Sequence, residues 1–279
     1  LEFVFDKSFT GKLSQFGLDP NRRTPSGIKA AIIREKGTNG EREMAYMLYL
    51  AGFDVKDVTM TDLISGRETL EDINMVVYCG GFSNSDVLGS AKGWAGSFLF
   101  NPKAKAALDN FYAREDTLSL GVCNGCQLMM ELGLITPEDK KKGKMLHNDS
   151  HKFESNFLGV TVPMNRSVMF GSLSGSKLGI WVAHGEGKFS LPYPEDHYNV
   201  VLKYSYDEYP GNPNGSDYSV AGIASQDGRH LAMMPHLERA CFPWENAYYP
   251  LDRKEEDQIT PWMEAFVNAR KWVEANRKK

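Results

Sequence analysis

The hydrophobic positions in the first half of the chain predict strands that alternate with helices. Residues 28–33 form a short, mostly apolar run, which is typical of a buried parallel strand. A T-x-x-E pattern at 38–41 predicts a capped helix start, and apolar residues follow at helical spacing over 44–51. Further strands are predicted at 53–58, 73–79 and 117–122, with a helix at 104–113. This alternation favours a parallel sheet covered by helices on both faces.

The second half of the chain shows shorter apolar runs, which suggest antiparallel strands. These runs lie at 158–162, 178–183, 200–206, 218–224 and 230–234. A last helix is predicted with Thr260 as N-cap and Pro261 at its first position, and Lys278 and Lys279 fall near its negative end. We therefore expect an α/β fold whose central sheet is mostly parallel and flanked by helices, with some antiparallel strands in the second half.

Residues 1–27 differ from the rest of the chain because their apolar positions are scattered and they end in a polar, turn-rich run from Asp19 to Gly27. We expect this segment to be a linker and the folded domain to span 28–279. The chain begins with Leu1 rather than methionine, which suggests a processed product or part of a longer polypeptide.

Composition narrows the range of functions. The 279 residues are 42% hydrophobic and carry a net charge of -4, so a sizeable core is expected and a nucleic-acid partner is not. The sequence has no apolar run of about 18 residues and no signal peptide, which argues against a membrane. Four irregularly spaced cysteines argue against a disulfide framework. These features predict a soluble, cytoplasmic protein that acts on small molecules or proteins.

The strongest chemical signal is the segment Gly121-Val122-Cys123-Asn124-Gly125. An apolar strand precedes it and a helical pattern follows, so it fits the G-x-nucleophile-x-G spacing of a nucleophile elbow. Cys123 would then stand at a helix N-terminus, where backbone N–H groups and the helix dipole favour the thiolate. The sequence therefore predicts a cysteine nucleophile.

A base, an acid and oxyanion donors can also be proposed. His236 and Glu238 follow a predicted strand and are two residues apart, so in an extended chain both side chains would point the same way. The carboxylate could then orient the imidazole beside the thiolate. Gly80 and Gly81 follow another strand, and we expect the N–H groups of Gly81 and Asn124 to form an oxyanion hole.

Together these motifs resemble the class I (triad) glutamine amidotransferases. The resemblance implies a flavodoxin-like fold, with Cys123 as nucleophile, His236 as base and Glu238 as orienting acid. It also implies that L-glutamine is held by Gln127 and by the backbone around Ser83 and from His184 through Gly185 to Glu186. One departure is visible, because Leu237 stands where the family usually has proline between the histidine and the glutamate.

Within that family, the elbow, the segment 182–187 and the turn 212–216 are similar to the glutaminase domain of a purine-biosynthesis enzyme that converts formylglycinamide ribonucleotide to its amidine. In its large, single-chain forms this domain follows an ATP-dependent synthetase. The resemblance thus implies that residues 1–27 link to an upstream synthetase, that ATP and Mg²⁺ act there, and that this domain needs no cofactor or metal. In agreement, the segment 171–177 fails the spacing of a phosphate-binding loop.

Two alternatives from other classes stay open at this point. Another cysteine hydrolase of the same fold, a peptidase or an amidase, would share the elbow. A non-catalytic regulatory module would account for the departure at Leu237 as decayed function. A redox or zinc role for Cys123 and Cys126 is disfavoured because there is no second cysteine pair. His184 could also be a core histidine rather than a residue of the glutamine pocket.

Overall fold

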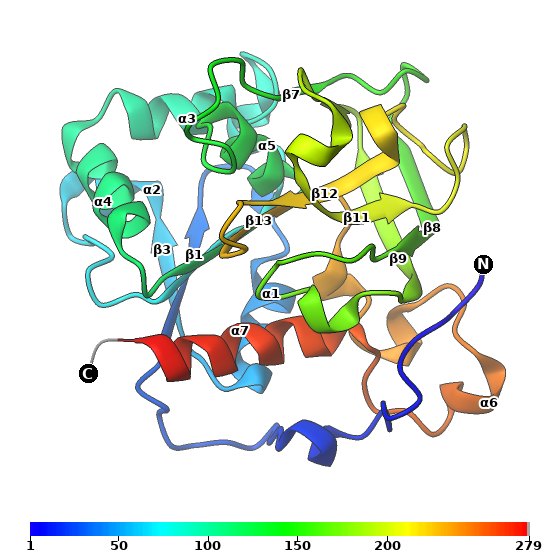
Figure 1. Ribbon diagram of the computed structural model, residues 1–279. Coiled ribbons are helices and arrows are strands. Elements are labelled where there is room, and N and C mark those ends of the chain that lie inside the picture. Colours follow the sequence, from blue (N-terminus) through cyan, green and yellow to red (C-terminus); the bar gives the residue numbers. More distant parts are fainter. Residues whose placement is uncertain (278–279) are drawn as a thin grey trace.

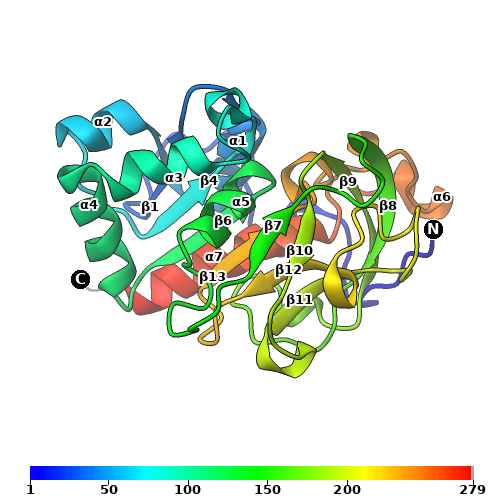
Figure 2. The same cartoon turned by 90° about the horizontal axis from the view of Figure 1, so that it is seen from above.

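A mixed β-sheet forms the centre of the computed structural model, which describes residues 1–277 (Figures 1 and 2). Within these residues the sheet has nine strands in the order β3-β1-β4-β6-β13-β12-β11-β8-β9. Its parallel half contains β3 (Asp54–Thr59), β1 (Lys29–Arg34), β4 (Met75–Tyr78), β6 (Leu118–Val122) and β13 (His230–Met233). Its antiparallel half continues from β13 through β12 (Val220–Ala224), β11 (Asn199–Tyr204), β8 (Glu154–Thr161) and β9 (Lys177–His184). The expected fold class is therefore confirmed.

Helices cover the sheet in two groups. In the first, α1 (Glu41–Ala51) packs against α7 (Trp262–Asn276), which crosses below the strands in Figure 1. The second comprises α2 (Met60–Ser65), α3 (Lys92–Leu99), α4 (Pro102–Ala113) and α5 (Asn124–Glu131). Residues 124–130 of α5 are all buried, which makes it the central helix of this group. A short α6 (Leu251–Lys254) precedes α7. Lys278 and Lys279 lie outside the described residues.

Two separate two-stranded sheets accompany the large one within the described residues. One pairs β2 (Thr38–Asn39) with β5 (Gly80–Gly81), and the other pairs β7 (Lys144–Leu146) with β10 (Lys188–Ser190). The first shows that the predicted capping box is wrong. Thr38 is engaged in strand pairing, and α1 begins only at Glu41 after Gly40, whose left-handed backbone turns the chain. The start of α7 is also later than expected, with Pro261 rather than Thr260 at the cap.

The antiparallel half curls back toward the parallel half. Although β9 is the last strand in the sheet order, Trp181 in its middle forms an antiparallel bridge with His236, which lies just after β13. The His236 N–H donates to the Trp181 carbonyl oxygen at 2.9 Å. This return brings the end of β9 to the carboxyl ends of the central parallel strands, where the predicted catalytic residues lie.

Residues 1–27 lie against the folded body. Val4 exchanges two backbone hydrogen bonds with Lys177 at 2.8 and 2.7 Å, and the Phe9 side chain is buried. The Gly11 carbonyl oxygen accepts from the N–H groups of Gln258 and Ile259. The interpretation of this segment as a linker from an upstream region stays a prediction. Across residues 1–277, no helix combines the length and the apolar character that crossing a bilayer requires.

Candidate active site

Cys123 occupies a strained turn between β6 and α5. Its backbone angles are φ 53° and ψ -108°, a conformation that costs a non-glycine residue about 1–3 kcal/mol. The neighbouring glycines make the turn possible. A Cβ on Gly121 would lie 2.5 Å from the Gly125 carbonyl oxygen, and one on Gly125 would lie 2.0 Å from that of Tyr78. The chain therefore forms the expected strand-to-helix elbow, with Cys123 at the helix N-terminus.

His236 meets Cys123 because β13 and β6 are neighbouring parallel strands, whose carboxyl ends lie at the same edge of the sheet. A Cβ placed on Gly80 would be 2.8 Å from the His236 ring and 3.4 Å from Cys123 Cβ. The Cys123 side chain thus lies beside the His236 ring, and its thiol donates to the Ala183 carbonyl oxygen at 3.6 Å. On the other side of the ring, His236 Nδ1 lies 2.7 Å from Glu238 Oε1. The structure thus brings the three predicted catalytic residues together.

The local geometry around Leu237 differs from the sequence expectation. The chain does not stay extended after His236, because Leu237–Arg239 forms a single 3-10 turn. Leu237 is fully buried, and its carbonyl oxygen accepts from the Ala240 N–H at 3.1 Å. This bond and the one from His236 to Trp181 hold the turn without the proline that the family usually has.

The two histidines near the thiol have opposite electrostatic surroundings. Burial alone would lower the pKa of His236, but the Glu238 carboxylate and the Cys123 side chain outweigh it and raise this pKa to about 10. For His184, burial and the nearby charge of His236 lower the pKa to about 4. At neutral pH, His236 is therefore an imidazolium and His184 a neutral ring. No described residue offers a hydrogen-bond partner to either nitrogen of His184.

Among the described residues, the backbone geometry leaves the two N–H groups expected to form the oxyanion hole without a backbone acceptor. Hydrogen-bonded and non-bonded pairs alternate along an antiparallel ladder, and Phe82 N–H donates to the Gly37 carbonyl oxygen. The neighbouring pair of Gly81 with Thr38 is thus the non-bonded kind, and the Gly81 N–H points away from β2. Asn124 is the first residue of α5, so its N–H has no acceptor within the helix.

A cavity of about 180 Å³ opens beside the thiol. It is lined by residues from four chain regions: Gly81, Phe82, Asp86, Ser90, Cys123, Gln127, His147, Phe153, His184, Gly185 and Glu186. Gln127 supports one side of it, since its Nε2 donates to the Glu186 carbonyl oxygen at 2.8 Å. Ser83 does not line the cavity, and its N–H already donates to Asn124 Oδ1 at 3.0 Å. A roomier hollow of about 670 Å³ near Asn74 and Arg114 is lined by no cysteine, serine or threonine.

Sequence reasoning missed several residues around this cavity. Asp86 ends the short 3-10 segment Ser83–Asp86, which has no recognisable sequence pattern, and its Oδ1 is buried with no hydrogen-bond partner among the described residues. Burial, and then the charge of Glu186, raise the pKa of Asp86. Phe82 and Phe153 contact each other at the rim, with ring centroids 6.0 Å apart. Within residues 1–277, no cluster of three or more His, Cys, Asp or Glu side chains could hold a metal ion.

The cysteine elbow, the imidazole paired with a carboxylate and the small pocket beside the thiol are the parts that a cysteine-dependent amidotransferase requires. A family model of the CobB/CobQ-like glutamine amidotransferase domain matches residues 27–273. The chain belongs to this family, which confirms the class predicted from the motifs.

Within this class, the chain is similar to phosphoribosylformylglycinamidine synthase. It is 44% identical over 266 residues to the probable chloroplastic/mitochondrial enzyme of Arabidopsis thaliana, covering 88% of this chain and 19% of that protein. It is also 44% identical over 281 residues to the human enzyme, covering 90% and 21% of the two chains. The chain thus spans about a fifth of the length of these relatives. The alternatives of another hydrolase or a non-catalytic module are not favoured.

Solved structures with the same fold include glutamine amidotransferases. PurLQS from Thermotoga maritima superposes with a TM-score of 0.64 at 28% identity, covering 88% of this chain and 99% of that one. A glutamine amidotransferase from the same organism gives a TM-score of 0.52 at 16% identity, covering 89% and 99% of the two chains. At that identity the second likeness concerns the fold alone.

Proposed function

We propose that this chain hydrolyses the side-chain amide of L-glutamine through a thioester on Cys123. The observation that carries the proposal is the position of the elbow cysteine beside the buried His236 ring, whose Nδ1 lies 2.7 Å from a Glu238 carboxylate oxygen. An imidazolium stabilises the thiolate that attack requires and holds a proton for the leaving group. The ammonia would be supplied to an ATP-dependent synthetase that makes formylglycinamidine ribonucleotide in purine biosynthesis.

In the proposed first half-reaction, the Cys123 thiolate attacks the glutamine side-chain carbonyl. The N–H groups of Gly81 and Asn124 stabilise the oxyanion that forms on the carbonyl oxygen. His236 gives its proton to the amide nitrogen, the carbon–nitrogen bond breaks, and ammonia leaves a γ-glutamyl thioester. The now neutral His236 is then available as a base.

In the second half-reaction, His236 takes a proton from water and the resulting hydroxide attacks the thioester. Collapse of this second oxyanion breaks the carbon–sulfur bond, releases glutamate and restores the thiolate. His236 is already an imidazolium again, because it took its proton when the water was activated. Glu238 takes no proton in this scheme, because its role is to orient and stabilise the charged ring.

The pocket has groups suited to both charges of an α-amino acid. Asp86 and Glu186 supply carboxylates for the α-ammonium group, and the unpartnered Asp86 Oδ1 is relieved when a cation approaches. The N–H groups of Gly185 and Glu186 carry no hydrogen bond to another described residue. These N–H groups are therefore available to the α-carboxylate of glutamine.

The partner and the location are further parts of the proposal. Ammonia released into water becomes ammonium and loses its nucleophilicity, so direct coupling to the synthetase region is chemically favourable. ATP and Mg²⁺ would act in that region, which we expect on the same polypeptide, with residues 1–27 as the linker. We expect the protein in the cytoplasm, although the Arabidopsis relative is named as chloroplastic/mitochondrial.

The test is glutamate release from glutamine by the full-length polypeptide and by this chain alone. We expect weak release alone and a marked rise when the synthetase region is present. A glutamine-like electrophile should label Cys123, and the Cys123→Ala variant should not be labelled. Peptide cleavage without glutamine hydrolysis, or no labelling of the full-length polypeptide, would overturn the proposed function.

A further inference from the structure

The segment His184–Gly187, which we call the pocket strip, needs outside support. Its residues 185–187 connect β9 to β10 without belonging to either strand, so no ladder satisfies their backbone groups. Yet the strip forms one side of the cavity next to Cys123. Buried backbone groups require hydrogen-bond partners, and a recognition surface made of backbone requires a fixed conformation. Other segments of the chain must therefore hold the pocket strip in its conformation.

Asn148 holds the strip from the loop after β7. It is completely buried, and its side-chain Nδ2 donates to the His184 carbonyl oxygen at 2.8 Å, while its Oδ1 accepts from the Gly187 N–H at 3.0 Å. Its backbone N–H donates to the Gly185 carbonyl oxygen at 2.9 Å. One asparagine thus contacts three of the four residues of the strip.

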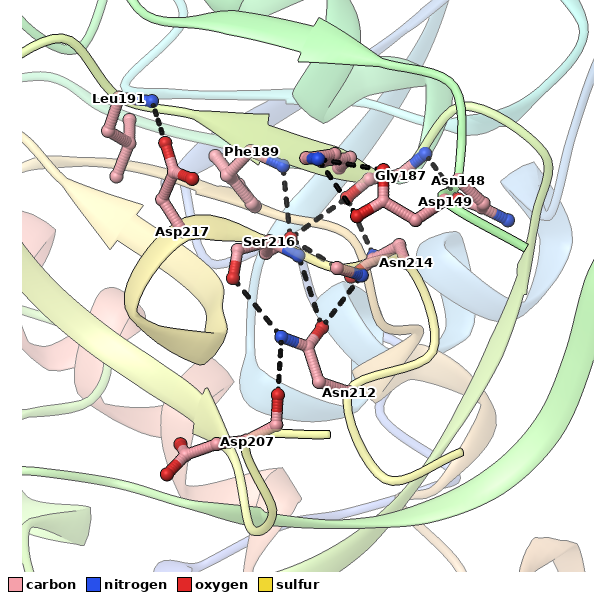
Figure 3. A network of polar contacts seen from close by, with 12 residues as sticks. Asn148, Asp149, Gly187, Phe189, Leu191, Asp207, Asn212, Asn214, Ser216 and Asp217 are labelled. Carbon is pink, nitrogen blue, oxygen red and sulfur yellow. Dashed lines mark hydrogen bonds and ion pairs between the residues drawn. The ribbon is translucent and has the colours of Figure 1, made fainter. Parts of the chain in front are cut away.

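Asn214 holds the same strip from the loop between β11 and β12, as Figure 3 shows. It is also completely buried, and its Nδ2 donates to the Gly187 carbonyl oxygen at 2.6 Å. Its Oδ1 accepts from the Ser216 hydroxyl at 2.9 Å, and that hydroxyl in turn accepts from the Phe189 N–H at 3.0 Å. The second asparagine therefore fixes the end of the strip and the start of β10.

The residue type matters at both positions. A carboxamide donates through its nitrogen and accepts through its oxygen, whereas an ionised carboxylate of the same shape only accepts. At position 148 the carboxylate would face the carbonyl oxygens of His184 and Lys152, both of which now accept from Nδ2. Because the site is buried, this repulsion is not screened by water. The asparagines are thus suited to fix backbone rather than to bind the ligand.

We infer that Asn148 and Asn214 are positioning residues for substrate recognition, holding the pocket strip so that the N–H groups of Gly185 and Glu186 meet the glutamine carboxylate. The inference rests on the proposed function. The elements that carry Cys123 and His236 are β6, α5 and β13, and neither asparagine has a hydrogen bond to them. Loss of either carboxamide should therefore weaken glutamine binding and leave the reactivity of the thiol intact.

The experiment compares Asn148→Asp and Asn214→Asp with the wild type in the full-length polypeptide. Three quantities are measured: the KM for glutamine, the kcat for glutamate release, and the rate at which iodoacetamide alkylates Cys123. A fourth is the glutamine concentration that half-protects Cys123 from alkylation. Asn199→Asp is the matched control, because Asn199 is a buried asparagine that bonds Arg166 N–H and the Ser225 carbonyl oxygen, away from the strip.

We expect Asn148→Asp to raise KM and the half-protecting concentration by roughly tenfold or more, the equivalent of one or two lost buried hydrogen bonds. Asn214→Asp should do so less strongly, because Tyr204, whose hydroxyl now accepts from Asn214 Nδ2 at 3.2 Å, can donate to the new carboxylate. This milder variant keeps the test open if Asn148→Asp does not fold. The alkylation rate without glutamine and all values for Asn199→Asp should stay at the wild-type level.

Two results overturn the inference alone. In the first, both asparagine variants have the same half-protecting glutamine concentration as the wild type. In the second, Cys123 of either variant is alkylated more slowly than that of the wild type when glutamine is absent. The second would mean that the carboxamides shape the whole site rather than the strip. A wild-type polypeptide that glutamine never protects would instead remove the proposed function, and the inference with it.

Discussion

The two halves of the sheet contribute to the candidate site in different ways. In the parallel half, β4, β6 and β13 are neighbours, and the oxyanion glycines, the thiol and the imidazole each follow the carboxyl end of one of them. In the antiparallel half, the pocket strip reaches the site only because β9 curls back onto His236, and side-chain amides hold it there. Regular hydrogen-bond ladders thus fix the reacting groups, whereas a buried polar network fixes the recognition surface.

The largest expected effect tests the parallel half at its nucleophile. Cys123→Ala should lower glutamate release by roughly a thousandfold to a millionfold, because no other group can form the thioester. Cys126→Ala is the control, since this thiol lies within α5, three residues after Cys123, and does not line the cavity. The steady-state rate of the full-length polypeptide measures both. Comparable losses in the two variants would show that the elbow matters for folding and not for its nucleophile.

The next effect concerns the charge on the base. Glu238→Gln should lower turnover by roughly a hundredfold to ten-thousandfold, because the imidazolium loses its oriented carboxylate. It should also flatten the pH dependence of stability. The pKa of His236 is raised to about 10, above the 6.5 of a free histidine, so its stabilisation is complete below 6.5 and is lost as pH rises toward 10.

Thermal melting at pH values between 6.5 and 10 measures the pH dependence of stability. The wild-type melting temperature should fall across the window, and that of Glu238→Gln should fall less. Equal slopes for the two proteins would show that the carboxylate does not hold the ring in its charged form.

A smaller effect concerns the elbow as a packed turn. Gly125→Ala should destabilise the fold by about 3 kcal/mol, because the new methyl group would overlap the Tyr78 carbonyl oxygen. Gly96→Ala, in α3, is the matched control. Its Cβ would meet nothing nearer than the Phe100 ring at 3.7 Å, and alanine in a helix is favoured by about 0.5–1 kcal/mol. Denaturant unfolding of both variants decides whether the elbow tolerates a side chain.

The smallest expected effect tests which half of the sheet contributes the carboxylate that recognises the α-ammonium group of glutamine. Asp86→Asn, next to the parallel half, and Glu186→Gln, in the strip, should each raise the KM for glutamine by roughly three- to tenfold with little change in kcat. Glutamine saturation curves for the two variants and for the double variant measure this. If only one single variant has an effect, recognition of the ammonium belongs to that half alone.

Local sequence signals identified the reacting groups well. The elbow is visible because its glycines are required within five consecutive residues, and the strands before Gly80 and His236 are short apolar runs. Where local signals competed with tertiary pairing, they failed. Thr38 has a good capping pattern, but the pairing of β2 with β5 takes it into a strand. Helices α2 and α3 were missed because their six and eight residues are too few to show a clear period.

The pocket strip shows a second limit of sequence analysis, which is that supporting residues far away along the chain leave no local pattern. Its residues could be named as substrate-binding from a resemblance, but nothing in the segment 184–187 indicates that Asn148 and Asn214 hold it. These asparagines lie 36 and 27 residues from their acceptors along the chain. In a sequence, such residues look like ordinary loop positions.

The sequence by itself determined the alternation of strands and helices, the strained cysteine turn and the chemistry of the three catalytic candidates, because each depends on spacing within a few residues. Only the tertiary structure decided the strand order that places thiol beside imidazole, the return of β9, and the buried carboxamides behind the strip. The physical reason is that these depend on contacts between distant segments, which form only when burial of the common core brings them together.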